Sequence, residues 1–255
     1  MTELNYPKVS IITVCYNSER SILNTVKSVD EQTWKNIEHI IIDGGSTDKT
    51  LEIIEFHSKR ISRLVSEKDN GIYHAMNKGL DLSNGDIIGF LNSDDFFSNE
   101  NVIEEYAEAF QQDQALGACY GDISYIAKNV DDGIKILRKW ETGEYKIGSF
   151  SKGWIPPHPS FYTKKTMFEK FGNFNEDLRY AADFDLIFRF ICKGIKTKYF
   201  ADNKVYMRVG GVTNKSWSNI YRGNKEIISV LKKNDINVGL NFFISKFIKR
   251  LKQYL

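Results

Sequence analysis

The sequence contains few cysteines, few prolines and no long apolar run. Among its 255 residues there are 3 cysteines and 4 prolines. Cys15, Cys119 and Cys192 lie far apart without a CxxC pair, which argues against a disulfide scaffold and a zinc site and favours buried thiols in a reducing compartment. No stretch approaches the roughly 20 apolar residues that a membrane-spanning helix requires. The apolar run at residues 9–15 is too short for a secretory signal, so we expect a cytoplasmic protein.

A strong charge of one sign is also missing. The formal net charge is +2, so no overall field draws the chain to nucleic acid, and no nucleic-acid partner is expected. The sequence contains neither GxGxxG nor GxxxxGKS/T, which argues against dinucleotide and P-loop sites. At 42% hydrophobic and 27% charged residues, the composition is typical of a globular chain that folds as one large domain or two small ones.

The first hundred residues alternate between strand and helix patterns. Apolar runs predict strands at 9–14, 38–43, 63–66 and 86–91, and helices with an apolar face lie between them. This order predicts parallel strands joined by right-handed crossovers. We therefore expect an α/β fold with a Rossmann-like, mostly parallel sheet flanked by helices.

The pattern changes after residue 101. We expect one more helix, strands at 120–127 and 134–140, and irregular structure at 154–162, where three of the four prolines lie. Two helices at 163–171 and 182–193, two short strands at 196–201 and 205–209, and a helical remainder complete the prediction. The chain thus divides into residues 1–100, a smaller mixed-sheet half at 101–210, and a helical tail at 211–255.

Adjacent carboxylates follow the fourth predicted strand, in the run Asn92-Ser93-Asp94-Asp95. In open α/β sheets the ligand crevice lies beyond the carboxyl ends of the strands. Two close anions attract a hard divalent cation such as Mg²⁺ or Mn²⁺, which would in turn hold a phosphate. The alternative is that Ser93 or Asp94 caps a following helix.

Other polar residues follow the earlier strands, and two lie on the third helix. Asp43 closes a buried strand and could accept hydrogen bonds from a base or ribose, or it could cap the turn at 44–46. Asn77 and Lys78 could point toward phosphate, although a solvated position explains Lys78 equally well. The remaining strand-end candidates are Thr13, Tyr16, Asn17 and Glu19.

Two later segments carry further candidates. Trp154 and His158 lie on a proline-rich loop, where aromatic groups can stack on sugar rings, or the loop can be purely structural. Asp183 falls at a predicted helix start, which helix capping alone would also explain. Asp185 and Arg189 are four residues apart, so an ion pair is expected.

The ordered set of these motifs resembles the inverting family 2 glycosyltransferases of the GT-A fold. The matching segments are 9–17, 42–48, 77–79, 85–86 and 92–95. The later segments 157–161 and 182–186 are similar to the bacterial branch that builds O-antigens, capsules and colanic-acid-type polysaccharides. The resemblance implies metal-dependent transfer of a sugar from a nucleoside diphosphate sugar, most often a UDP-sugar, with inversion at the anomeric carbon.

The resemblance also assigns expected roles to individual residues. Asp183 would be the catalytic base, although Ala182 replaces the first member of the family's acidic pair. Asp94 would bind Mn²⁺ or Mg²⁺ with Asp95 sharing the metal, and Asn92 stands where the family often has Asp. Trp154 and His158 would contact the acceptor. The expected donor contacts are Thr13, Tyr16, Asn17, Glu19, Asp43, Asn77, Lys78, Asn92, Ser93 and Asp94.

The segment 242–255 places four cations and several large apolar residues in one predicted helix. Such a helix can lie on an anionic membrane, here the inner face of the plasma membrane, which suits an acceptor carried on a lipid pyrophosphate. A helix docked on the domain, or a homodimer contact, is the alternative. A catalytically inactive nucleotide-sugar-binding module is the alternative function. A nucleotidyltransferase is disfavoured, since residues 16–19 do not form a Gly-rich triphosphate loop.

Overall fold

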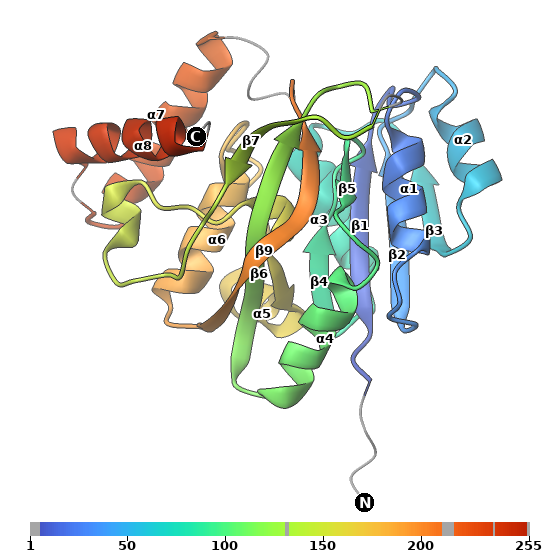
Figure 1. Ribbon diagram of the computed structural model, residues 1–255, viewed down its shortest axis with the longest axis horizontal. Coiled ribbons are helices and arrows are strands. Elements are labelled where there is room, and N and C mark those ends of the chain that lie inside the picture. The colour runs from blue at the N-terminus through green and yellow to red at the C-terminus, as the bar shows by residue number, and fades with distance from the viewer. Residues whose placement is uncertain (1–5, 131–132, 211–216, 237, 254–255) are drawn as a thin grey trace, which may run out of the picture.

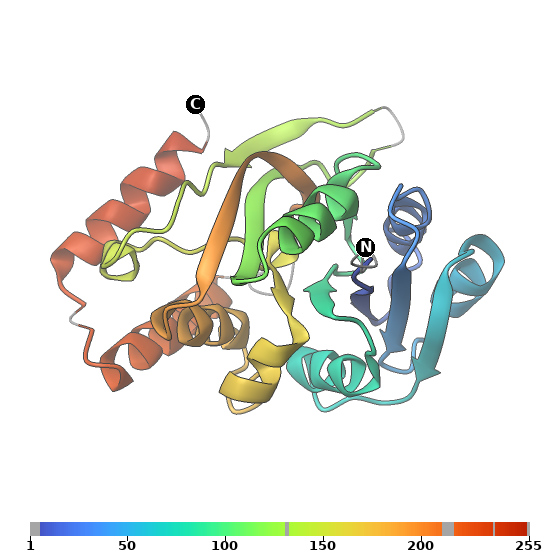
Figure 2. The same ribbon diagram turned by 90° about the horizontal axis from the view of Figure 1, so that it is seen from below.

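A single continuous sheet organises the described part of the chain. The computed structural model describes residues 6–130, 133–210, 217–236 and 238–253. The nine strands found there follow the order β3-β2-β1-β4-β8-β6-β9-β5, and β7 pairs with β6. Figures 1 and 2 show the N-terminal elements on one side of the molecule and helices α7 and α8 on the opposite side.

The N-terminal half is parallel, as the alternating sequence pattern predicts. Its strands are β1 (Val9–Cys15), β2 (Ile37–Asp43), β3 (Ile61–Ser66) and β4 (Ile87–Phe90). Its helices are α1 (Ile22–Asp30), α2 (Thr50–His57) and α3 (Ile72–Leu82). Cys15 lies opposite Asp43 in the β1–β2 register, so these two strands end level with each other. Loops that follow them therefore meet at one edge of the sheet.

The central strands are buried on both faces, which explains their continuous apolar character. On β1, Ile12 and Val14 pack in the cluster that includes α3 residues such as Met76. Ile11 packs in a second cluster on the opposite face, with residues of the later helix α4 (Val102–Gln112). Alternate side chains of one strand thus serve two cores, as the two-residue period of a strand requires.

The second half extends the same sheet with antiparallel pairs and one long parallel pair, β6 with β9. Its strands are β5 (Asp95–Phe97), β6 (Leu116–Ile126), β7 (Ile136–Trp140), β8 (Tyr162–Lys164) and β9 (Lys196–Arg208). Its α-helices are α4 (Val102–Gln112), α5 (Lys165–Phe171), α6 (Ala182–Cys192), α7 (Trp217–Lys233) and α8 (Leu240–Lys252). Two short 3₁₀ helices, η1 (Ser149–Lys152) and η2 (His158–Ser160), lie in the connection from β7 to β8. The predicted α/β class with a flanked, mixed and mostly parallel sheet is confirmed.

Some local predictions are wrong. The two short strands predicted at 196–201 and 205–209 are one strand, β9, because shifts in its pairing with β6 accommodate the polar residues between them. The helix predicted at 163–171 begins at Lys165, since Thr163 is buried and pairs with strands on both sides. Cys192 is exposed, unlike the buried Cys15 and Cys119.

The C-terminal helices cover the side of the molecule farthest from β3 (Figure 1). None of the described helices is long and apolar enough to cross a membrane. Residues 211–216, 237 and 254–255 of the predicted tail lie outside the described residues. Gly153 has φ +65°, and a Cβ added there would lie 3.1 Å from the Cβ of Lys246, so a glycine lets α8 approach this loop closely.

Candidate active site

The acidic motif lies at the carboxyl end of β4, and a short strand follows it. Asp95 starts β5, so the alternative that Ser93 or Asp94 caps a following helix is wrong. Asp95 is fully buried, and its Oδ2 accepts a hydrogen bond from Asn92 Nδ2 at 3.1 Å. Burial, followed by the nearby charge of Asp94, raises the pKa of Asp95 well above its usual range. Ser93 Oγ lies 2.8 Å from Ser18 Oγ and ties the motif to the loop after β1.

Two oxygen atoms in this motif are buried without a hydrogen-bond partner. They are Asn92 Oδ1 and Asp95 Oδ1. Unsatisfied buried acceptors are costly, and carboxylate or amide oxygens are the ligands that Mg²⁺ and Mn²⁺ prefer. Within the described residues no group of three His, Cys, Asp or Glu side chains could hold a metal by itself. The motif therefore fits a divalent cation whose remaining ligands come from phosphate oxygens and water.

Arg208 lies behind the motif, and the sequence patterns did not identify it. Its guanidinium donates to the main-chain oxygen of Asp94 at 2.9 Å and to Asn24 Oδ1 at 2.9 Å. The residue is only 5% exposed, on a strand more than a hundred residues later in the chain. Its charge lies near Asp95 and stabilises the anionic motif from the interior.

A hydrogen-bonded network joins the loops after β1 and β2. Asn17, at φ 49°, accepts a bond from the Thr47 N–H at 2.9 Å, and Glu19 accepts one from the Lys49 N–H at 3.2 Å. Asp43 is fully buried and caps the following turn, since its Oδ2 accepts bonds from the N–H groups of Gly45 and Ser46. Burial acts to raise the pKa of Asp43, but hydrogen bonds from the Ser46 and Ser66 hydroxyls and from the Ser46 N–H lower it below its usual value.

The residues predicted to contact the sugar donor differ in exposure and in their hydrogen bonds. Tyr16 is 63% exposed above the network. Thr13 is fully buried, and its hydroxyl lies 3.0 Å from Nε2 of His39 on the neighbouring strand. Its side chain is therefore covered by the protein. The side-chain amide of Asn77 donates to the carbonyl oxygen of Phe174 and accepts from the Phe174 N–H. Lys78 forms ion pairs at 2.6–2.7 Å with carboxylates of the loop before α3.

Asp183 lies in the first turn of α6, as predicted, and it faces a tyrosine from the N-terminal half. Its Oδ1 accepts a hydrogen bond from Tyr73 Oη at 3.1 Å and one from the Phe184 N–H at 2.8 Å. Burial, with the charge of Asp183 adding to it, raises the pKa of Tyr73 well above its usual range, so Tyr73 stays a donor. Asp185, two residues later, points elsewhere and pairs with Arg189 at 2.8 Å, which confirms that predicted ion pair.

His158 and Trp154 are both buried near Asp183. The His158 ring stacks on Phe90, and its Nε2 has no hydrogen-bond partner. Burial lowers the pKa of His158, although the charge of Asp183 acts in the opposite direction. Trp154 is packed in an aromatic cluster and donates from Nε1 to the Thr142 carbonyl oxygen at 2.9 Å.

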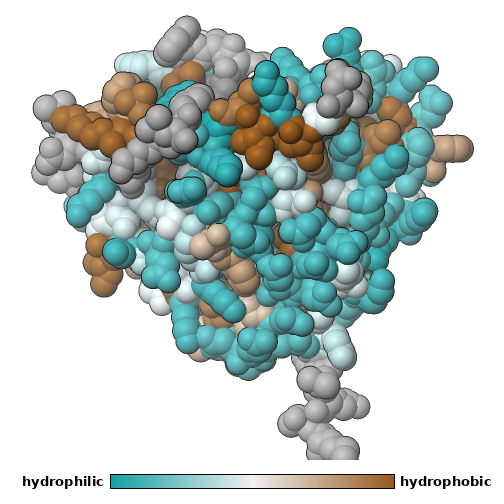
Figure 3. Space-filling view, in the orientation of Figure 1, coloured by the Kyte–Doolittle hydropathy of each residue, from teal (hydrophilic) through white to brown (hydrophobic). Residues whose placement is uncertain are grey.

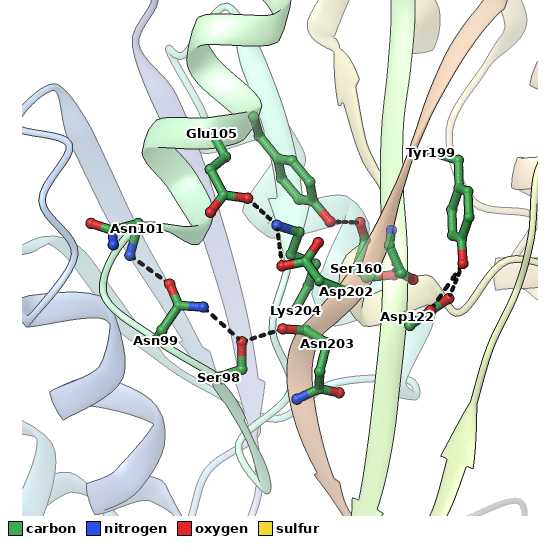
Figure 4. A network of polar contacts seen from close by, with 12 residues as sticks. Ser98, Asn99, Asn101, Glu105, Asp122, Ser160, Tyr199, Asp202, Asn203 and Lys204 are labelled. Carbon is green, nitrogen blue, oxygen red and sulfur yellow. Dashed lines mark hydrogen bonds and ion pairs between the residues drawn. The ribbon is translucent and has the colours of Figure 1, made fainter.

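A buried polar network holds the His158 loop against the sheet (Figure 4). Ser160 Oγ donates to the Gly121 carbonyl oxygen at 2.7 Å, and Tyr106 Oη donates to the Ser160 carbonyl oxygen at 3.0 Å. Beside Tyr106, the fully buried Lys204 forms ion pairs with Glu105 and Asp202. The bonds made by Ser160 therefore anchor the loop to β6 and α4.

A cavity of about 760 Å³ brings the two halves of the site together. Asn92 of the acidic motif lines it, and so do Asp183, His158 and Trp154. Asn92 and Asp183 are far apart in the sequence, and they come from the ends of β4 and the start of α6. One cavity thus holds Asn92 of the acidic motif together with the Asp183 carboxylate, which is able to accept a proton.

Comparison with known proteins gives a consistent picture. The model of the family described as Glycosyl transferase family 2 matches residues 10–173. An uncharacterized glycosyltransferase of Mycobacterium tuberculosis is 31% identical over 185 residues, which cover 72% of this chain and 68% of that protein. The chondroitin synthase of Escherichia coli is 32% identical over 71% of this chain, but the match covers only 26% of the synthase.

Solved structures share the fold at low sequence identity. S. aureus TarS 1-349 in complex with UDP-GlcNAc superimposes with a TM-score of 0.67 at 18% identity, covering 93% of this chain and 69% of that one. The mannosyltransferase PcManGT from Pyrobaculum calidifontis, in complex with GDP-Man and Mn²⁺, gives 0.66 at 20% identity, covering 98% and 70%.

Proposed function

This chain belongs to glycosyl transferase family 2, and we propose that it is a metal-dependent, inverting hexosyltransferase. Its donor is a nucleoside diphosphate sugar, with a UDP-sugar as the first candidate, and its acceptor is a lipid-linked saccharide of a bacterial surface polysaccharide such as an O-antigen or capsule. The observation that carries this proposal is the shared cavity of Asn92 and Asp183.

Asp183 is the proposed base. Its carboxylate accepts the proton of the acceptor hydroxyl as that oxygen attacks the anomeric carbon and the nucleoside diphosphate leaves from the opposite face. The bonds from Tyr73 and from the Phe184 N–H fix the orientation of the carboxylate. Because the attack is direct, no enzyme nucleophile is required.

The acidic motif is the proposed site for Mn²⁺ or Mg²⁺. Asn92 Oδ1 and Asp95 Oδ1 are buried acceptors without partners, and Asp94 adds a carboxylate beside them. A bound divalent cation would offset the charge that develops on the leaving diphosphate. Arg208, behind the motif, holds the Asp94 backbone in place.

The nucleotide is proposed to lie over the loops after β1 and β2. Tyr16 is exposed there, and Asn17, Glu19 and Asp43 fix the surrounding backbone. TarS, a structural relative, is described in complex with UDP and with UDP-GlcNAc, which supports UDP as the first nucleotide to test.

An anionic membrane surface is the proposed partner of the C-terminal helix. The outward side chains Phe243, Phe247 and Leu251 of α8 are 47%, 63% and 52% exposed. Figure 3 shows apolar side chains gathered over this helix and over the region of β7, where Ile136 is also exposed. Exposed apolar patches of this kind mark interaction surfaces, and the cations of α8 suit anionic lipid.

The proposed function is tested by incubating the chain with a panel of nucleotide-sugars, Mn²⁺ and a lipid-pyrophosphate-linked sugar. We expect one donor to be consumed in a Mn²⁺-dependent reaction that forms a longer saccharide of inverted anomeric configuration. Metal-dependent UDP binding without transfer or donor hydrolysis would instead favour the inactive binding module.

A further inference from the structure

Helix α8 places two cations at the cavity and exposes several apolar side chains. Lys246 and Arg250, four residues apart on one stripe of the helix, line the cavity that contains Asp183. On a neighbouring stripe, Phe247 and Leu251 are more than half exposed. Phe242, in the first turn, is 2% exposed and packs in the main core cluster, so α8 docks on the domain there and exposes apolar side chains farther along.

The cations of α8 face two more on β7. Arg138 and Lys139 line the same cavity, and Arg138 lies 3.6 Å above the Tyr125 ring. We call Arg138, Lys139, Lys246 and Arg250 the cationic wall. The carboxylates that line the cavity are Glu141 and Asp183, so its charged lining is positive.

Nothing acidic in the described residues neutralises the α8 side of this wall. Lys246 Nζ donates to the amide oxygen of Asn224 at 2.6 Å, and no described carboxylate forms an ion pair with Lys246 or Arg250. Burial, together with the charge of Arg250, lowers the pKa of Lys246 to about 8, so Lys246 still carries its charge for the most part at neutral pH.

We propose that the cationic wall binds the phosphate or pyrophosphate of the acceptor, an inference that rests on the proposed function. The proposed nucleotide loops follow β1 and β2, whereas α8 lies on the opposite side of the molecule (Figure 1). Asp183 lies at the cavity between them, so an acceptor whose hydroxyl reaches Asp183 extends toward α8. Guanidinium and ammonium groups bind phosphate oxygens strongly. Phe247 and Leu251, each next in sequence to a cation of the wall, are exposed and offer an apolar surface to a lipid chain.

Binding of farnesyl pyrophosphate to the full chain tests this inference. Trp140 and Trp154 line the cavity, so their fluorescence reports occupancy. We expect Arg250→Gln and Lys139→Gln each to weaken binding about tenfold, because each removes one charged hydrogen-bond donor to the phosphate. Because Lys139 lies on β7, its variant tests the wall without altering α8. Lys35→Gln, an exposed cation elsewhere, removes the same charge and should not change the affinity.

Two comparisons decide the source of the phosphate. Farnesol should bind far more weakly than farnesyl pyrophosphate, and UDP with Mn²⁺ should bind the variants and the parent chain equally. Equal binding of farnesol and farnesyl pyrophosphate, or weakened UDP binding with unchanged farnesyl pyrophosphate binding, would overturn the proposal. Turnover of nucleotide-sugars is measured separately, so loss of the wall and loss of the proposed function are distinguishable.

Discussion

The loops after β1 and β2 and the cavity wall beyond Asp183 are built in different ways. In the loops, Asn17, Glu19 and Asp43 bond neighbouring backbone N–H groups, so their polar atoms are already used in holding the site. In the cavity, His158 Nε2 and Asn92 Oδ1 have no partner, and α8 presents cations toward the space. The polar atoms of the first region are already hydrogen-bonded within the protein. The second region keeps polar groups without a partner, which a bound ligand would satisfy.

Asp183→Asn should have the largest effect, because it removes the proposed base from the second region alone. We expect transfer to fall by about 10²–10⁴-fold, the usual contribution of a positioned general base. Binding of UDP should persist, since the loops after β1 and β2 are unchanged. Both are measured on one preparation, by product formation and by calorimetry.

Asp185→Asn is the matched control, because it removes a carboxylate from the same helix. It breaks the pair with Arg189 and should cost about 1 kcal/mol of stability while leaving transfer close to that of the parent chain. Equal loss of transfer in both variants would assign the effect to the helix and not to a base at Asp183.

The difference between the regions also explains what the sequence could predict. The strand ends at Asp43 and Asp94 and the helix start at Asp183 follow from short local patterns, and their positions are as expected. The contact of Tyr73 with Asp183 joins residues 110 positions apart, and no local pattern encodes it. Arg208 had a weak signal, since it is a charged residue in an otherwise partly buried strand.

Asn92→Asp tests the acidic motif, which lies where the two regions meet. A carboxylate at position 92, in addition to that of Asp94, would lie beside the buried Asp95 and should lower the melting temperature of the metal-free chain by a few degrees, because each kcal/mol corresponds to about 2–4 °C at this size. Mn²⁺ should then raise the melting temperature more than in the parent chain, since a bound ligand stabilises the folded state.

Asn84→Asp provides the control for this variant. Asn84 lies against Glu38 at the opposite end of the strands, so the substitution also places two carboxylates together but away from the motif. It should destabilise the chain without any added response to Mn²⁺. A Mn²⁺ response of Asn92→Asp no larger than that of the parent chain would contradict a metal site in this motif.

His39→Gln tests the strand β2, which leads into one of these loops, through the pH dependence of folding. Burial lowers the pKa of His39 from 6.5 to about 3, so the folded chain keeps it neutral. Its contribution to stability is therefore complete above pH 6.5 and is lost as the pH falls toward 3, by about 1.4 kcal/mol per unit. Urea unfolding at pH 7.5 and 5.5 should show a smaller loss in the variant than in the parent chain. His57→Gln should retain the parent dependence, and an unchanged slope in His39→Gln would contradict the assignment.

Phe247→Ser together with Leu251→Ser should have the smallest effect. This double variant tests whether exposed apolar side chains on α8 bind membrane while those on the opposite side of the molecule do not. These side chains are 63% and 52% exposed on α8, whereas Phe56 is 82% exposed on α2 at the other side of the molecule. Since burying one large apolar side chain contributes about 1.5–3 kcal/mol, partial insertion of two should change vesicle affinity about tenfold. Sedimentation with anionic vesicles measures it, and Phe56→Ser is the matched control. If Phe56→Ser releases the chain as well as the α8 variant does, exposure alone and not its position beside the cavity would govern membrane binding.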